Sequence, residues 1–144
     1  MRFSLVPAFG LAAALIAAQP ALADDEPDSS FVRMHAVDLL ENALTPEQIT
    51  TLQLVAYQAA IAAACDGFTL DGAKVGKAFE KLAPVDAAKM TDAQKSYHDQ
   101  HLLVIYGILV GGELAAMADD VSAACDKAAE AKADPEFAAE VVWE

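Results

Sequence analysis

Basic residues are scarce in this chain of 144 residues, which has nine Lys and Arg against 22 Asp and Glu and a formal net charge of −13 at pH 7. Nucleic acids and anionic membranes are bound mainly through Lys and Arg, so a chain with so few cations does not attract them. The composition therefore excludes nucleic acid and anionic membrane surfaces as expected partners.

Motifs of the common catalytic classes are missing as well. The sequence has no Gly-x-Ser-x-Gly, His-Glu-x-x-His or Cys-x-x-Cys-His, and Ser96 and His98 lie two apart, which makes them face different ways on a helix. The segment GAKVGKA at 72–78 lacks the glycine spacing and the hydroxyl residue of a phosphate loop, and 67–78 has too few oxygen ligands for a calcium loop. Because no nucleophile, base and stabilising group can be nominated together, we expect a non-enzymatic protein.

The first 23 residues, MRFSLVPAFGLAAALIAAQPALA, have the pattern of a secretory signal peptide. Arg2 precedes an apolar stretch at 3–18, and Ala21-Leu22-Ala23 supplies small residues where signal peptidase reads the chain. The alternative is an uncleaved anchor, but the stretch is shorter than the ~20 residues of a spanning helix. We therefore expect a periplasmic or secreted mature protein without a membrane span; losing Arg2 leaves eight basic against 22 acidic residues, a net charge of −14.

After the leader, the sequence predicts a short acidic tail at 24–29, disordered and solvated, and then one helical domain at 30–144. Apolar residues in this domain recur at three- and four-residue steps, without the alternation of a half-buried strand. The predicted fold class is all-α, a small antiparallel bundle of four to five helices joined by short connections.

Capping residues mark the expected helix ends. The first helix starts near Ser30 and stops before Thr45. Three kinds of signal place the others: N-caps or capping boxes, a left-handed glycine, and prolines that break or begin a helix. Thr45 with Gln48 and Thr91 with Gln94 form the capping boxes, Asp71 and either Asp119 or Asp120 are N-caps, and Gly67 is the left-handed glycine. Ala83-Pro84 breaks a helix, and Asp134-Pro135 is expected to begin a short terminal helix ending in EVVWE.

The two cysteines, Cys65 and Cys125, enclose about sixty residues. Export would expose them to an oxidising compartment, where thiols that lie close in space form a disulfide. A thiol oxidoreductase would have Cys-x-x-Cys beside a strand and a helix instead. The sequence thus favours one structural disulfide over free buried thiols and over metal-binding or redox cysteines.

Three histidines carry a metal-site hypothesis. His98 and His101 are three apart in HDQH, so a helix would place both imidazoles on one face. His35, or a carboxylate from a neighbouring helix, could complete a zinc or copper site. The competing interpretation is that His98 is solvated and that His101 is a partly buried polar residue; apart from this site, no cofactor is expected.

Every residue from Leu102 to Gly112 is apolar or glycine, which predicts a helix buried on most sides and too short to span a bilayer. Gly107 and Gly111, four apart, would let another helix of the same chain approach closely, or leave a groove for an apolar ligand beside Tyr106. On another predicted helix, Lys74, Lys77 and Lys81 share one face, which fits either a solvated face or a docking surface for an acidic partner.

Two functional classes follow. The first is a non-enzymatic protein of the cell envelope that interacts with, protects or scaffolds other exported proteins. The export signal, the two distant cysteines and the apolar helix resemble those of periplasmic acid-stress chaperones, whereas the length and charge differ and no motif assigns the family. The second class is a small binding module, for a transition metal at His98 and His101 or for an apolar ligand near Gly107 and Gly111. The sequence does not indicate an oligomeric state.

Overall fold

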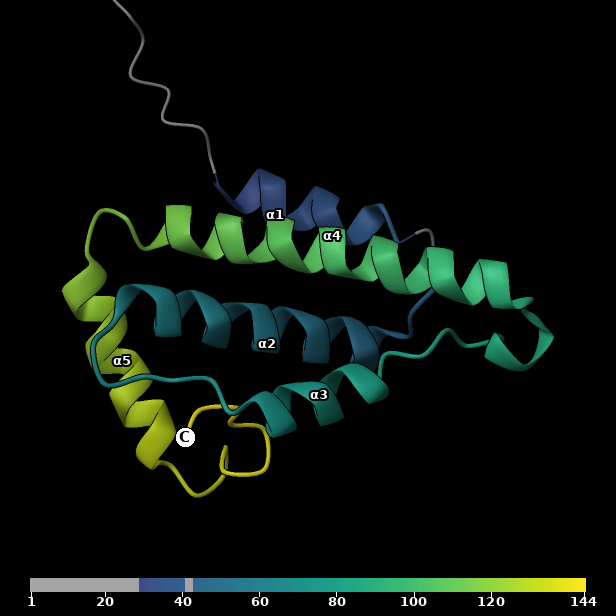
Figure 1. The fold of residues 1–144 in the computed structure, drawn as a ribbon. Helices are drawn as coiled ribbons and strands as arrows, with labels where there is room; N and C mark the ends of the chain where they lie inside the picture. The colour runs from purple at the N-terminus through teal and green to yellow at the C-terminus, as the bar shows by residue number, and fades with distance from the viewer. Residues whose placement is uncertain (1–28, 41–42) are drawn as a thin grey trace, which may run out of the picture.

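The structure, a computed structural model, describes residues 29–40 and 43–144 (Figure 1). These residues form five α-helices and one 3-10 turn, and they contain no strand: α1 (Ser29–Asp38), α2 (Pro46–Ala64), α3 (Gly72–Glu80), η1 (Ala87–Lys89), α4 (Asp92–Ala116) and α5 (Val121–Ala133). The predicted all-α fold class is therefore confirmed. The predicted signal peptide and tail lie outside the described residues, except for Ser29, which is the first residue of α1.

Side-chain caps begin the helices where the sequence predicted them. Thr45 and Thr91 each form a capping box, in which the threonine hydroxyl accepts from the backbone N–H three residues on and Gln48 or Gln94 accepts in return. The carboxylates of Asp71 and Asp120 cap α3 and α5. Gly67 has a φ of +84°, the left-handed conformation expected of the residue that lets the chain turn away after α2.

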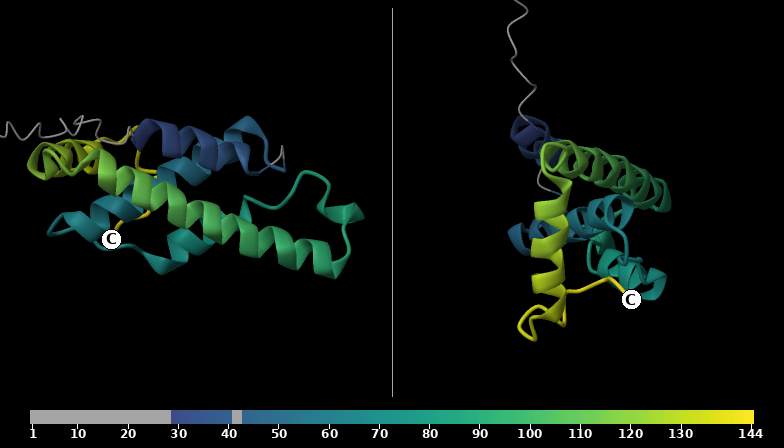
Figure 2. Two further views of the ribbon diagram at one scale, coloured as in Figure 1. Left: turned by 90° about the horizontal axis from the view of Figure 1, so that it is seen from above. Right: turned by 90° about the vertical axis from the view of Figure 1, so that its left-hand side faces the viewer.

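The helices pack in pairs, with α5 lying across one end (Figures 1 and 2). α1 lies antiparallel on α4, and α2 lies antiparallel to α3, whereas α2 and α4 run side by side in the same direction because α3 carries the chain back between them (Figure 1). Among the described helices, none is long and apolar enough to cross a membrane by itself; α4 and α5 pass that test only as a pair, bent by 116°.

Two large groups of buried side chains hold this arrangement together, and a third, smaller one of Val55, Ala78 and Val142 lies between α2 and α3. The larger one joins α1, α2 and α4, with Leu52, Ile105 and Leu109 almost completely buried at its centre. The second lies where α2 ends and α5 begins, and it includes Ile61, Cys65 and Trp143. Burial of large aliphatic and aromatic side chains contributes roughly 1.5–3 kcal/mol each, so these two clusters are the main source of stability.

The chain after Asp134 does not form the predicted terminal helix. Residues 135–140 are turns and 141–144 are extended, with an isolated bridge between Leu70 and Trp143. Successive side chains of an extended segment point to opposite sides. Val142 therefore enters the cluster between α2 and α3, while Trp143 enters the cluster beside the cysteines. This tertiary packing, together with the bridge to Leu70, overrides the local helix signal.

Candidate functional site

The predicted disulfide between Cys65 and Cys125 is present and ties the end of α2 to α5. The two Cα atoms are 5.7 Å apart, across a sequence separation of 60 residues. Cys65 is buried beside Trp143 and Met117, so the bond belongs to the core of this end of the molecule. Within the described range no cysteine is free, and neither sulfur is a metal ligand or half of a Cys-x-x-Cys pair.

The structure does not bring the three histidines together. His98 is buried, and its Nε2 donates to the carbonyl oxygen of Leu82 at 3.1 Å. His101 packs against the ring of Tyr97, and His35 lies on the exposed side of α1 with its Nδ1 3.2 Å from Asp38. No group of three or more His, Cys, Asp or Glu side chains among residues 29–40 and 43–144 is placed to hold a metal ion. His98 and His101 line one cavity, but neither His35 nor a carboxylate lines it with them, so the predicted site around His98, His101 and His35 is not assembled among the described residues.

Of the two arrangements predicted for Gly107 and Gly111, close approach of another helix is not found among the described residues. A Cβ atom added at either position would have no neighbour within 4 Å, so no helix within residues 29–40 and 43–144 packs on these glycines. The close approach occurs at Gly112, where an added Cβ would lie 2.8 Å from Cγ of Arg33 in α1. Tyr106 does not cap a groove at the glycines; its ring contacts Phe79 of α3 at 5.2 Å between centroids, and burial raises the pKa of its hydroxyl.

Apolar side chains on the open side of α4 form the most unusual surface of the protein. The expectation that the helix around 102–112 is buried on most sides is wrong, since Leu103 is 58% exposed and Val104 60% exposed. With Gly107 and Gly111, these residues follow the three- and four-residue spacing of one helix face. The opposite side of α4, with Leu102, Ile105 and Leu109, carries the core contacts.

α1 extends this surface. Leu39, the residue after the end of α1, is exposed and lines a cavity of about 450 Å³ with Tyr97 and His101 of α4, and Val32 of α1 is exposed seven residues earlier. We call this surface the outer face and define it by Val32 of α1 and Leu39 just after α1, with Leu103, Val104, Gly107 and Gly111 of α4.

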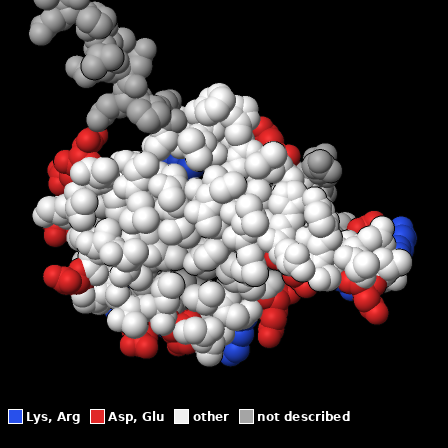
Figure 3. Space-filling view, turned by 45° about the horizontal axis from the view of Figure 1, so that its top comes forward, with Lys and Arg blue, Asp and Glu red and all other residues white. Residues whose placement is uncertain are grey.

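Charge is nearly absent from the outer face. Between Gln100 and Ala116 the only charged residue of α4 is Glu113. Its carboxylate accepts from Nη1 of Arg33 at 3.0 Å, so this charge is neutralised by α1. Figure 3 shows the result as a broad, mostly white area in which one small blue patch is visible, with acidic and a few basic residues around its rim. In a chain with 22 acidic residues, such an area is a departure from the rest of the surface.

The outer face was missed in the sequence because an apolar run is ordinarily read as a buried helix. The signal was present all the same: from Leu102 to Gly112 all sides of the helix are apolar, whereas the two helices that contact α4 most, α1 and α2, leave one of its sides uncovered. Contiguous exposed apolar surface of this kind marks interaction sites more often than single exposed residues do.

Comparison with known proteins gives no match. No protein-family model matches this sequence, and no curated protein or solved structure is significantly similar to it. The feature of the molecule that points to a function is therefore the geometry of the outer face.

Proposed function

We propose that this protein is a small exported, non-enzymatic protein of the cell envelope, which binds exposed apolar segments of other exported proteins through the outer face and so protects them. The observation that supports it is the uncharged, apolar side of α4, in which Leu103 and Val104 are more than half exposed. A surface that remains apolar at a cost in solubility is typical of a binding surface.

The acidic remainder of the molecule suits this role. Exposed carboxylates repel one another, which keeps an acidic protein and whatever it carries in solution. The open glycines add a second suitable feature, since Gly107 and Gly111 leave the backbone of α4 accessible to an apolar chain that approaches closely. The disulfide is the kind of covalent link that small exported domains use where thiols are oxidised.

The binding surface is tested by replacing its two exposed aliphatic residues. We expect Leu103→Gln with Val104→Gln to lose most of the ability of the wild-type protein to suppress aggregation of a client. Light scattering would follow a client that aggregates on dilution from denaturant, so that no reductant reaches the Cys65–Cys125 disulfide.

Val85→Gln is the matched control, because Val85 is 68% exposed but lies between α3 and η1, away from the outer face. It should suppress aggregation as well as the wild-type protein does. Equal activity of all three proteins, or no suppression by the wild type, contradicts the proposal. A dimer that sedimentation detects in the wild type but not in the double variant, without client protection, would make a second copy the partner.

The export half of the proposal has its own measurement. The intact mass of protein isolated from its natural cell should correspond to a chain that begins at Asp24, lowered by two hydrogens for the disulfide. A mass that includes the first 23 residues would contradict export by a cleaved signal peptide.

A further inference from the structure

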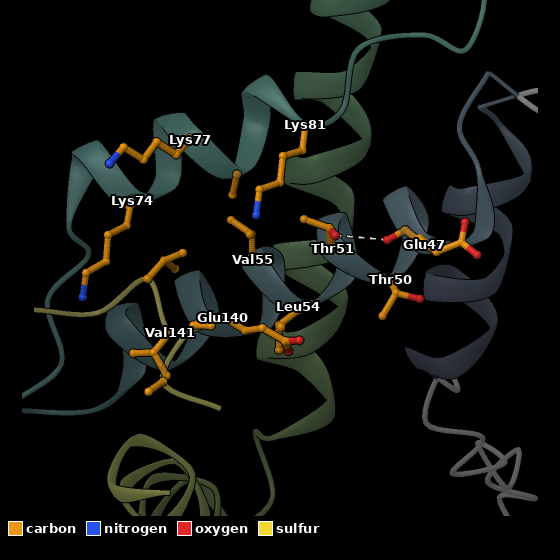
Figure 4. Close-up of a pocket in the computed structure, with 14 residues that line it drawn as sticks. Glu47, Thr50, Thr51, Leu54, Val55, Lys74, Lys77, Lys81, Glu140 and Val141 are labelled. Carbon is orange, nitrogen blue, oxygen red and sulfur yellow. Dashed lines mark hydrogen bonds between the residues drawn. The ribbon is translucent and has the colours of Figure 1, made fainter. Parts of the chain in front are cut away.

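A second surface, separate from the outer face, is hollowed into a cleft of about 590 Å³ between α2, α3 and residues 138–142 (Figure 4). Its floor is apolar and includes Leu54, Val55, Ala78 and Val142, of which Val55, Ala78 and Val142 are buried. A volume of this size is in the range of sites for small organic ligands, which are largely apolar with a few polar groups.

One wall of the cleft is cationic. Lys74, Lys77 and Lys81 all line it, so three of the eight Lys and Arg residues after position 23 lie at this cleft. Their three- and four-residue spacing places them on one face of a helix. The ammonium of Lys74 donates to the carbonyl oxygen of Trp143 at 2.7 Å and so holds the C-terminal segment that forms another wall. In Figure 4 the side chain of Lys81 extends over the floor toward Val55.

Lys77 and Lys81 have no acidic partner within the described part of the chain. The only ion pairs found there join Arg33 to Glu113 and His35 to Asp38. Two carboxylates also line the cleft. Glu47 points away from it, whereas Glu140 lies beside Leu54 on the wall opposite α3 (Figure 4). Three ammonium groups against two carboxylates leave one positive charge, in a protein whose total charge is strongly negative.

The geometry points to a binding site for one amphipathic anion, a medium-chain aliphatic carboxylate, with its headgroup at Lys77 and Lys81 and its chain along Leu54, Val55 and Ala78. An inorganic anion would leave the apolar floor in contact with water, and an uncharged apolar molecule would leave the two ammonium groups unused. A charge-assisted hydrogen bond at one end and apolar contact along the chain use both features of the cleft. This inference does not depend on the outer face, which lies on α1 and α4.

The test is titration of the disulfide-bonded protein with dodecanoate below its micellar concentration, followed by calorimetry and by amide shifts of residues 54–55 and 138–142. We expect saturable binding with one molecule per chain. Lys77→Glu with Lys81→Glu should weaken it by roughly tenfold or more, as expected for loss of charge-assisted hydrogen bonds. Lys89→Glu with Lys95→Glu makes the same change in net charge outside the cleft and should leave the affinity unchanged.

Three other ligands distinguish the sources of affinity. Acetate tests the headgroup alone, decyltrimethylammonium tests the chain with the opposite charge, and phosphatidylglycerol vesicles test a lipid surface. Each should bind far more weakly than dodecanoate. Equal loss in both lysine double variants, equal binding of the cationic amphipath, binding only to vesicles, or no saturable binding of dodecanoate would each overturn the inference. Circular dichroism of each variant checks that the helices are intact.

Discussion

The disulfide end of the molecule and the outer face differ in whether their side chains are buried and hydrogen-bonded or exposed to solvent. At the disulfide end, Gln58 is 2% exposed and yet makes two side-chain hydrogen bonds, donating to the carbonyl oxygen of Glu140 at 2.9 Å and accepting from the N–H of Val142 at 2.7 Å. The indole Nε1 of Trp143 donates to the backbone oxygen of the same glutamine at 2.9 Å. On the outer face, by contrast, Leu103 and Val104 point into solvent.

This difference separates the part of the molecule that stabilises the fold from the part that is accessible to a binding partner. The disulfide end uses a covalent link, buried hydrogen bonds and an aromatic contact, with the rings of Phe68 and Trp143 4.7 Å apart, to hold segments that are distant in sequence. The outer face contributes little to folding, since its side chains leave water only slightly. Substitutions at the disulfide end should therefore change the free energy of unfolding, and substitutions on the outer face should change binding.

The largest effect is expected from loss of the disulfide. Cys65→Ser with Cys125→Ser releases a cross-link across 60 residues. In the chain-entropy model this lowers the free energy of unfolding by about 4 kcal/mol. Urea denaturation followed by circular dichroism measures it, with dithiothreitol-treated wild type as the comparison. A change below about 1 kcal/mol would mean that this end is held by packing alone.

Gln58→Ala should have the next largest effect. It removes both side-chain hydrogen bonds to the C-terminal segment and leaves the buried N–H of Val142 without a partner. An unsatisfied buried donor costs about 1–3 kcal/mol. The matched control is Gln53→Ala, which makes the same change at an exposed position of α2 and should alter the unfolding free energy by less than about 0.5 kcal/mol. Equal effects of the two changes would show that the buried hydrogen bonds of Gln58 do not stabilise the disulfide end.

Alanine substitutions at two glycines of α4 test which of its sides is open and which is packed against α1. Gly107→Ala should raise the free energy of unfolding by about 0.5–1 kcal/mol, because alanine favours a helix and an added Cβ meets nothing within 4 Å. Gly112→Ala should lower it by about 1 kcal/mol or more, since the same methyl group would displace Arg33 and disturb its ion pair with Glu113. Thermal unfolding of both variants measures the difference, and a stabilising Gly112→Ala would show that α1 is loosely packed.

The smallest effect at neutral pH concerns the inward-facing tyrosines. Burial, with the nearby charge of Glu113 as a lesser cause, raises the pKa of Tyr57, and burial raises that of Tyr106. The unfolded chain therefore loses these protons first as pH rises through about 10, so the contribution of the two tyrosines to the free energy of unfolding is constant well below that pH and falls above it. In Tyr57→Phe with Tyr106→Phe this fall should be smaller, as measured by urea midpoints between pH 9 and 11.5. An unchanged fall would place its cause in other groups.

Local signals predicted the starts of α2, α3, α4 and α5, whereas the same kind of signal at Asp134-Pro135 begins only turns. A capping hydroxyl or carboxylate at Thr45, Asp71, Thr91 or Asp120 acts on backbone groups two or three residues away, so its effect can be seen in sequence. The disulfide could be predicted because the chain has only two cysteines. The histidine pair could not be interpreted in this way, since the partner of His98 is a carbonyl of the α3–η1 segment, to which no sequence spacing points.

Three features could be recognised in the amino-acid sequence: the starts of α2 to α5, the pairing of the two cysteines, and the large excess of acidic over basic residues. The tertiary structure alone decided that one apolar side of α4 faces solvent, that the last four residues run extended past Gln58, and that three lysines share a cleft with an apolar floor. The two kinds of feature depend on different distances along the chain. Caps act within one helical turn, whereas burial of a side chain depends on which distant segments lie beside it.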